Sequence, residues 1–331
     1  MSIGSPDIRS LRSVEIATPA LDEATEFYSG PWGLDVISAE RDATWFRAAG
    51  PEHHVLALRR SEHAGLGKLS FAMADKRSVD EAAARFDCLG LPLLDGPGNV
   101  DGPAGGYALM TADIEGRRVE LLAESNAVTR GDPSGSRPLG VTHVVLNTVD
   151  IDAAVMFWQE VFGFRLSDWS EHQMAFLRCN TYHHAIAFNQ ASWTSINHVA
   201  FEMASVDDFM RGVGRLRQAC HPAGWGPGRH GPGDNTFAYF VDPSGVVCEY
   251  TSEVARVDES TWIPRVWART PELSDTWGTA GAPSADIRRH MAGEADPWLS
   301  ETLPSTPLHA APDLSGQTPD SPDATARRSQ L

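Results

Sequence analysis

The chain has 331 residues, of which 42% are hydrophobic, and it carries a formal net charge of −17. This length is sufficient for two domains of ordinary size, each with its own core. The acidic excess argues against binding to nucleic acid or to an anionic membrane surface, since both require clustered lysine and arginine. The sequence has no run of about 18 apolar residues. It also lacks a basic N-terminal region followed by an apolar stretch, so a cytoplasmic protein is expected.

Alternation of apolar and polar residues predicts two successive strand and helix units in the first part of the chain. In the first unit we expect a strand, a helix and three strands at 12–18, 19–28, 33–40, 43–49 and 54–60. The second unit begins with a strand at 69–73 and a helix at 78–89, opened by Ser78 with Glu81 three residues later. Strands at 107–113 and 117–122 complete it, after a Gly- and Pro-rich stretch, 95–106, that predicts a loop.

A polar, turn-forming stretch, 131–138, predicts a linker between two domains, and the same plan begins again after it. The two halves align at an offset of about 130 residues. Three pairs of segments show the repeat: Asp150–Trp158 with Ala20–Tyr28, His183–Phe188 with His53–Leu58, and His198–Met203 with Lys68–Met73. The repeat predicts an N-terminal domain over residues 1–130 and a C-terminal domain over 139–255.

Three candidate metal ligands lie in the second half, each within a short alternating apolar run: His143, His198 and Glu249. A single His or Glu on a strand is more often an ordinary hydrogen-bonded residue. Two imidazoles and one carboxylate, however, form a set that leaves three coordination positions open, as in non-heme Fe(II) oxygenases. We therefore interpret this half as a candidate metal-binding domain.

Comparison of the halves favours the metal interpretation over a purely structural one. Ser13 and Lys68 stand where the second half has its two histidines. Only the glutamate has a counterpart, Glu120, which is one residue out of the common offset. A structural role would have allowed both copies to keep the same polar residues. The complete set is thus expected only in the second half.

The chain continues beyond residue 255 with a segment unusual for its tryptophans. Trp262, Trp267 and Trp277 are spaced among prolines and glycines in 256–300, which predicts a segment that wraps over the second domain with its indoles buried. Residues 301–331 are rich in Pro, Ser, Asp, Ala and Thr and show no apolar period, so they are expected to be disordered.

Three motifs of the second half carry a resemblance to a known family. They are Cys179–His184 (CNTYHH), Gly226–Gly231 (GPGRHG) and Phe237–Gly245 (FAYFVDPSG), the last running into Glu249. With the duplicated unit, residues 9–255 resemble the type I extradiol ring-cleavage dioxygenases of the vicinal oxygen chelate superfamily. The resemblance implies an α+β fold of tandem βαβββ modules, in which paired modules form two domains, each a curved open barrel around a cavity.

The resemblance also implies roles for individual residues. His143, His198 and Glu249 would hold Fe(II), less often Mn(II), and His184 would serve as the acid-base histidine. His230 would contact substrate and bound oxygen, and Tyr239 would be the active-site tyrosine. The substrates would be O2 and a catechol-type compound from aromatic degradation, and a homo-oligomer is expected.

One departure and two alternatives accompany this interpretation. Trp225 stands five residues before His230, where relatives acting on carboxylated catechols place arginine, which predicts an aromatic-lined pocket for a more apolar catechol. The same module builds glyoxalase-type isomerases and lyases, although those commonly take ligands from both modules of a pair. It also builds metal-free binding or resistance proteins, which would need no set of three ligands. Both alternatives remain open from the sequence.

Overall fold

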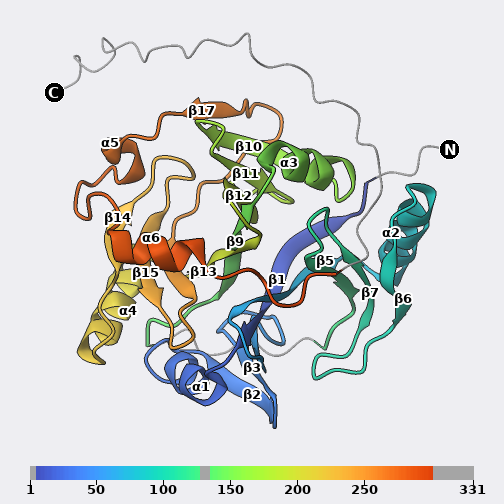
Figure 1. The fold of residues 1–331 in the computed structure, drawn as a ribbon, viewed down its shortest axis with the longest axis horizontal. Coiled ribbons are helices and arrows are strands. Elements are labelled where there is room, and N and C mark those ends of the chain that lie inside the picture. Colours follow the sequence, from blue (N-terminus) through green and yellow to red (C-terminus); the bar gives the residue numbers. More distant parts are fainter. Residues whose placement is uncertain (1–4, 127–134, 301–331) are drawn as a thin grey trace.

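The computed structural model describes residues 5–126 and 135–300 of the chain (Figure 1). The first half forms an eight-stranded mixed sheet in the order β2-β3-β4-β1-β5-β8-β7-β6. Its elements are β1 (Ile8–Thr18), α1 (Leu21–Ser29), β2 (Asp35–Glu40), β3 (Ala43–Arg47), β4 (Leu56–Arg60), β5 (Gly65–Met73), α2 (Lys76–Cys88), β6 (Leu93–Asn99), β7 (Tyr107–Ala112) and β8 (Arg118–Ala123).

The second half forms a nine-stranded sheet in the order β14-β15-β16-β13-β9-β12-β11-β10-β17. It is built from β9 (Gly140–Thr148), α3 (Ile151–Glu160), β10 (Arg165–Ser170), β11 (Met174–Arg178), β12 (Ile186–Gln190), β13 (Ser195–Glu202), α4 (Val206–Gln218), β14 (Trp225–Arg229), β15 (Thr236–Val241) and β16 (Val247–Ser252). The tail adds β17 (Arg265–Trp267), α5 (Pro271–Ser274) and α6 (Ala285–Ala292).

The two sheets repeat one plan, which confirms the predicted α+β fold of tandem βαβββ modules. In each module the first strand pairs in parallel with the last, as β1 does with β4 and β13 with β16. The first strands of neighbouring modules pair antiparallel, β1 with β5 and β9 with β13. Each half is therefore one curved sheet made from two modules, and β17 extends only the second (Figure 1).

Aromatic side chains join the two halves into one continuous core. Trp32 of the first half stacks on Tyr250 of the second, with ring centroids 4.0 Å apart. The Tyr28 hydroxyl donates a buried hydrogen bond to Asp242 Oδ2 at 3.1 Å. Large aromatic rings bury much apolar surface, and here their polar atoms also find partners across the boundary. The proposed division at 131–138 stays a prediction, because the first half of that stretch, 131–134, lies outside the described residues.

Two local predictions in the first half were wrong. Helix α2 begins at Lys76 rather than Ser78, because Asp75 is the N-cap: its carboxylate accepts from Ser78 N at 2.8 Å, and Ser78 Oγ accepts from Asp75 N at 3.0 Å. The expected loop 95–106 contains part of β6, which pairs with β7 through irregular register. Pro97 is tolerated there because β6 is an edge strand.

The segment after residue 255 wraps over the second sheet and reaches the first. Strand β17 pairs in parallel with β10, and α6 packs against β13. Asp296 Oδ1 accepts hydrogen bonds from Leu66 N and from Ile196 N, one in each sheet. Trp262 and Trp267 are half-buried, which is less than the prediction of buried indoles, and Trp277 is 42% exposed, contrary to the prediction. The disorder predicted for 301–331 falls outside the described residues.

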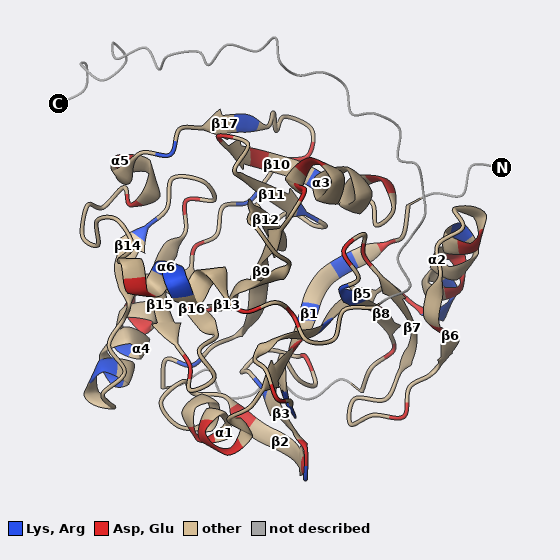
Figure 2. Ribbon diagram, viewed as in Figure 1, with Lys and Arg blue, Asp and Glu red and all other residues tan. Residues whose placement is uncertain are grey.

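Charged residues of both signs lie mainly on the helices and on strand ends (Figure 2). Within the described parts of the chain, no helix is long and apolar enough to cross a membrane.

Candidate functional site

Three adjacent central strands bring together the three ligand candidates. His143 lies on β9, His198 on β13 and Glu249 on β16, and these strands are neighbours in the sheet. Nε2 of each histidine lies 3.2 Å from Glu249 Oε2, and the candidate ligand atoms all lie within 4.8 Å of one another. All three side chains are buried. Side chains 55 and 51 residues apart in the sequence thus converge because β13 pairs with both β9 and β16.

Hydrogen bonds on the far side of each imidazole hold its ring. His198 Nδ1–H donates to Asn197 Oδ1 at 2.8 Å, and His143 Nδ1 forms a hydrogen bond with the Thr142 hydroxyl at 2.9 Å. Asn197 is itself held, since its amide donates to Asn147 Oδ1 at 3.0 Å. Each Nε2 faces the shared centre and would present a lone pair to a bound metal, as metal-binding histidines do when their other nitrogen is held by a polar partner.

The centre contains buried polar atoms that the rest of the described chain does not satisfy. Both Glu249 oxygens and His198 Nε2 have no hydrogen-bond partner among the described residues. Burial alone would raise the pKa of the Glu249 carboxyl, but the imidazoles of His143 and His198 lower it to about 2. A buried carboxylate without compensation is unfavourable, and a divalent cation would satisfy every one of these atoms. The residues therefore fit a metal site.

His184 lies beside this centre, two residues before the start of β12. Its ring centroid is 4.2 Å from that of His143, and burial, followed by the neighbouring histidines, holds its pKa well below the usual value. On the other side, Asp168 Oδ2 accepts a hydrogen bond from His183 Nε2–H at 3.1 Å. In the neutral His183 ring, Nδ1 is then an acceptor, and it accepts a hydrogen bond from His184 Nδ1–H at 3.0 Å. This chain of contacts leaves His184 Nε2 as an unprotonated acceptor.

Asp168 is fixed by the tail segment. Trp267 Nε1 donates to Asp168 Oδ2 at 2.7 Å, and the Arg265 backbone N–H donates to Oδ1 at 2.8 Å. The half-buried indole of Trp267 thus contributes a hydrogen bond as well as apolar contact. The tail thereby holds the carboxylate that orients His183 and, through it, His184.

His230 and Tyr239 form a second hydrogen-bonded pair at the site. His230 follows β14, and Tyr239 lies on β15 directly across from Glu249. His230 Nδ1–H donates to the Ser274 carbonyl at 2.9 Å, so His230 Nε2 accepts from the Tyr239 hydroxyl at 2.9 Å. Burial, then the charge of Glu249, raises the pKa of Tyr239 well above its usual value, which keeps the phenol protonated.

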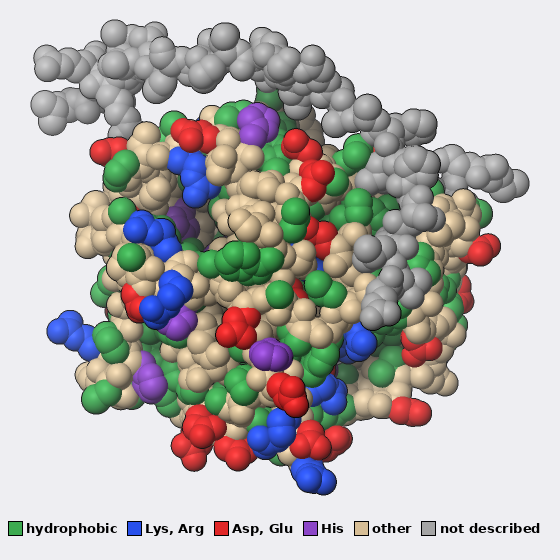
Figure 3. Space-filling model, in the orientation of Figure 1, with side chains coloured by type: hydrophobic (Ala, Val, Ile, Leu, Met, Phe, Trp, Pro, Cys, Tyr) green, Lys and Arg blue, Asp and Glu red, His purple; other side chains and the backbone are tan. Residues whose placement is uncertain are grey.

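A cavity of about 670 Å³ opens onto His143, His198, His184, His230 and Tyr239. Its size is within the usual range for small-molecule sites. Much of its wall is apolar, formed by Val145, Met174, Phe176, Trp193, Trp225, Pro232, Leu273, Pro283 and Met291. Figure 3 shows a hollow on this face of the molecule, with basic side chains at its edge and a histidine inside it.

Comparisons with known proteins agree with this geometry. Residues 140–250 match the model of the Glyoxalase/Bleomycin resistance protein/Dioxygenase superfamily. A crystal structure of the Mn(II)-bound glyoxalase from Novosphingobium aromaticivorans is 35% identical, covers 88% of this chain and 97% of its own, and has a TM-score of 0.83. The chain belongs to this superfamily. Its sheets have the vicinal oxygen chelate fold.

Two curated relatives within the superfamily are also similar. Metapyrocatechase 2 of Cupriavidus necator is 33% identical over 133 residues, which are 40% of this chain and 42% of the relative. Biphenyl-2,3-diol 1,2-dioxygenase of Paraburkholderia xenovorans (strain LB400) is 27% identical over 286 residues, which cover 78% of this chain and 94% of the relative. The chain thus spans less than half the length of the first relative and nearly all of the second.

Five of the six predicted site residues line one cavity, and the sixth, Glu249, is buried behind it in contact with His143 and His198. Trp225 lines it too and stacks on Tyr239 with ring centroids 5.1 Å apart, so the expected aromatic wall is present. The sequence analysis missed Arg269 and Arg288, which the tail contributes to the lining. Neither arginine lies in the three motifs of the second half, and no local pattern marks either one as a pocket residue.

Proposed function

We propose that this protein is an extradiol dioxygenase, which uses Fe(II) or Mn(II) and O2 to cleave a catechol-type ring beside its vicinal diol. One observation carries the proposal: a complete set of three buried ligands in one half adjoins a cavity that two of them line together with His184, His230 and Tyr239. The names of the two curated relatives support the same reaction class.

A bound divalent metal would supply open coordination positions that hold the two diol oxygens and O2 side by side. The protein's own residues then manage protons and orientation. His184 Nε2 is free to accept a proton from a diol hydroxyl, since its Nδ1–H is engaged by His183. Its lowered pKa keeps it neutral near pH 7, which is the state required of a base. The same nitrogen can return the proton later in the reaction.

His230 and Tyr239 would position the reacting groups on the wall formed by β14 and β15. The Tyr239 hydroxyl donates to His230, so its oxygen lone pairs remain available to a substrate hydroxyl. The bond from His230 to the Ser274 carbonyl fixes the ring orientation on which this pair depends. Because Ser274 ends α5, the tail segment takes part in building the proposed site.

The apolar wall supports a catechol with an apolar substituent. Met174, Phe176 and Trp193 could pack against a ring substituent without leaving buried polar groups unpaired. Arg269 and Arg288, which are exposed, line the same cavity and give it a cationic edge. A panel of catechol, 3-methylcatechol, 2,3-dihydroxybiphenyl and a carboxylated catechol therefore tests which part of the wall governs selectivity.

A second candidate is a metal-dependent isomerase or lyase of the glyoxalase type. The 35%-identical structure, described as an Mn(II)-bound glyoxalase, favours this alternative. In this chain, however, all three ligands come from one half, and the corresponding place in the first half contains Lys68 paired with Glu120. The grouping of His184, His230 and Tyr239 around one cavity also suits proton transfer to a diol.

Oxygen consumption separates the two candidates. The full chain is loaded anaerobically with Fe(II) or with Mn(II), and O2 uptake is measured with the catechol panel. In parallel, isomerisation of the hemithioacetal of methylglyoxal and glutathione is measured. We expect one O2 per catechol consumed and a coloured ring-opened product. Isomerisation without O2 uptake would replace the proposal with the glyoxalase alternative. If His184→Asn retains full activity in both assays, His184 has no part in the reaction. His172→Asn, the same change at an exposed position, is the matched control.

A further inference from the structure

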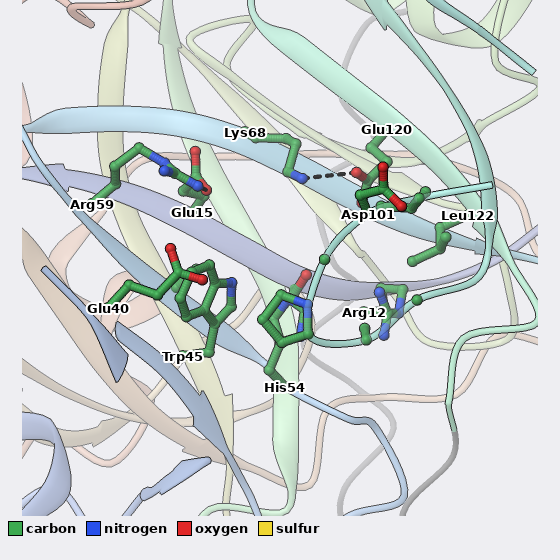
Figure 4. Close-up of a pocket in the computed structure, with 17 residues that line it drawn as sticks. Arg12, Glu15, Glu40, Trp45, His54, Arg59, Lys68, Asp101, Glu120 and Leu122 are labelled. Atoms are coloured by element: carbon green, nitrogen blue, oxygen red, sulfur yellow. Dashed lines mark hydrogen bonds and ion pairs between the residues drawn. The ribbon is translucent and has the colours of Figure 1, made fainter. Parts of the chain in front are cut away.

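The first sheet encloses a cavity of its own, of about 330 Å³, at the place equivalent to the metal centre of the second. In the second sheet Ala200 pairs with both His143 and Glu249, and in the first sheet Ser70 pairs with Ser13 and Glu120. The two cavities therefore occupy matching positions on β1, β5 and β8 and on β9, β13 and β16. Figure 4 shows the residues that line the first of these cavities.

An ammonium group occupies the centre of this cavity in place of metal ligands. Lys68 Nζ donates to Glu120 Oε1 at 2.7 Å (Figure 4). Ser70 Oγ donates to Glu120 Oε2 at 2.6 Å. Both carboxylate oxygens of Glu120 are thus satisfied, unlike those of Glu249. A cation bound there would be repelled by the positive charge of Lys68 at close range. The cavity is consequently unsuited to a metal ion.

Arg12 gives the cavity an unused pair of donors. Its side chain is 1% exposed, and its Nε donates to Glu52 Oε2 at 3.1 Å. Its terminal nitrogens, Nη1 and Nη2, are buried and have no hydrogen-bond partner among residues 5–126 and 135–300. Arg12 lines the cavity (Figure 4). Leaving charged donors buried and unpaired is costly, and a guanidinium presents two of them in the geometry of a planar carboxylate.

The other lining residues restrict the charge of a ligand. Arg12, Arg59 and Lys68 are each paired with a glutamate, but among the described lining cations Arg12 is the one whose terminal nitrogens are buried without a partner. Exposed Glu40 and Asp101 also line the cavity. Two exposed acidic groups disfavour a dianion such as phosphate, whereas a monoanion meets less repulsion and can accept hydrogen bonds from the Arg12 terminal nitrogens.

The remaining wall suits an apolar or aromatic body. Trp45 is 7% exposed, and Ala57, Ala104 and Leu122 are buried beside it. His54 also lines the cavity, and burial together with Arg12 lowers its pKa to about 3, so it is neutral and can accept or donate one hydrogen bond. Apolar contact with Trp45 would add to the affinity of an anion bound at Arg12.

We infer that this N-terminal cavity is a second ligand site, which binds a small monocarboxylate with an aromatic or apolar body through Arg12 and Trp45. The site is separate from the proposed catalytic pocket and does not depend on the activity assigned to it. Basic residues in the middle of the first sheet, on β1 and β5, are visible in Figure 2. Of these, Arg12 supplies the unpaired terminal nitrogens that the proposal requires.

The test is a titration of the full chain with 4-fluorobenzoate, followed by fluorine NMR and by calorimetry. We expect one saturable equivalent per chain, displaced by benzoate but not by benzamide or inorganic phosphate. Arg12→Gln should weaken binding at least tenfold, about the effect of losing charge-assisted hydrogen bonds. Arg60→Gln, which removes one positive charge paired with Asp22 outside the cavity, should leave the affinity unchanged.

Further variants make the result decisive if Arg12→Gln folds poorly. Ala104→Phe fills the cavity while leaving the Arg12–Glu52 pair in place, and it should abolish binding. His198→Ala alters only the second sheet and should retain it, which distinguishes this cavity from the proposed catalytic pocket. Absence of saturation at concentrations on the order of 10 mM, equal binding of benzamide, or full binding by Ala104→Phe would each overturn the inference.

Discussion

Asp296 lies in the C-terminal segment and connects the two sheets, which makes its ionisation a test of how the tail is held. Its Oδ1 accepts from Leu66 N at 2.8 Å and from Ile196 N at 3.1 Å, while its buried Oδ2 has no partner in the described chain. Burial raises the pKa of Asp296 from 3.8 to about 7. The folded protein therefore holds a proton between these pH values that the unfolded chain releases.

This difference sets the direction and size of the pH dependence. Because the folded state binds the extra proton, the contribution of Asp296 to the free energy of unfolding is fully present below pH 4 and is lost as the pH rises towards 7. About three pH units correspond to about 4 kcal/mol, of which about 3 kcal/mol is lost between pH 5 and pH 8. This is an upper limit, since local opening of the segment would expose the ionised carboxylate to water.

Asp296→Asn keeps the oxygen that accepts both backbone hydrogen bonds and removes the titration. The free energy of unfolding of the variant relative to wild type should therefore rise from pH 5 to pH 8 by up to about 3 kcal/mol. Urea denaturation of the full chain at both pH values measures this difference. Asp286→Asn, at an exposed position paired with Arg289, is the control and should show no such change. An equal gap at both pH values would refute the assignment of a raised pKa.

The remaining predictions concern the proposed site. His143→Ala or His198→Ala should abolish binding of the single metal equivalent expected per chain, and unchanged metal content in both variants would refute the site. His184→Asn should retain metal and catechol but lower the single-turnover rate by about 10² to 10⁴; a wild-type rate in metal-loaded protein would exclude it as acid or base. Asn197→Ala leaves His198 Nδ1–H without its acceptor, so metal affinity measured by chelator competition should fall about 10- to 100-fold, and unchanged affinity would show that Asn197 does not orient the ligand. A chain ending at Ser252 should lose thermal stability relative to one ending at residue 300, because it exposes the apolar wall of the cavity; equal melting temperatures would show that the tail contributes nothing.

The repeated pattern of apolar residues was sufficient to predict the modules. Strand alternation depends on neighbours two residues apart, which any sequence displays directly. This alternation located most strands to within a few residues. Comparison of the two halves also identified Glu120 as the counterpart of Glu249, which the matching strand registers confirm. It failed at Asp75, where a cap displaced the start of a helix by two residues, and at the edge strand that contains Pro97.

The contacts that complete both cavities could not be predicted in this way. Asp168 meets Trp267 across 99 positions of sequence, and His230 meets the Ser274 carbonyl across 44. Arg12 is an ordinary strand residue by its local pattern, and only the packing of β1 leaves its terminal nitrogens buried and unpaired. Residue types and their periodicity determined the modules and the candidate ligands. Which polar atoms find partners depends on long-range packing, and this was decided by the tertiary structure alone, because hydrogen bonds form between atoms that the fold brings within about 3 Å.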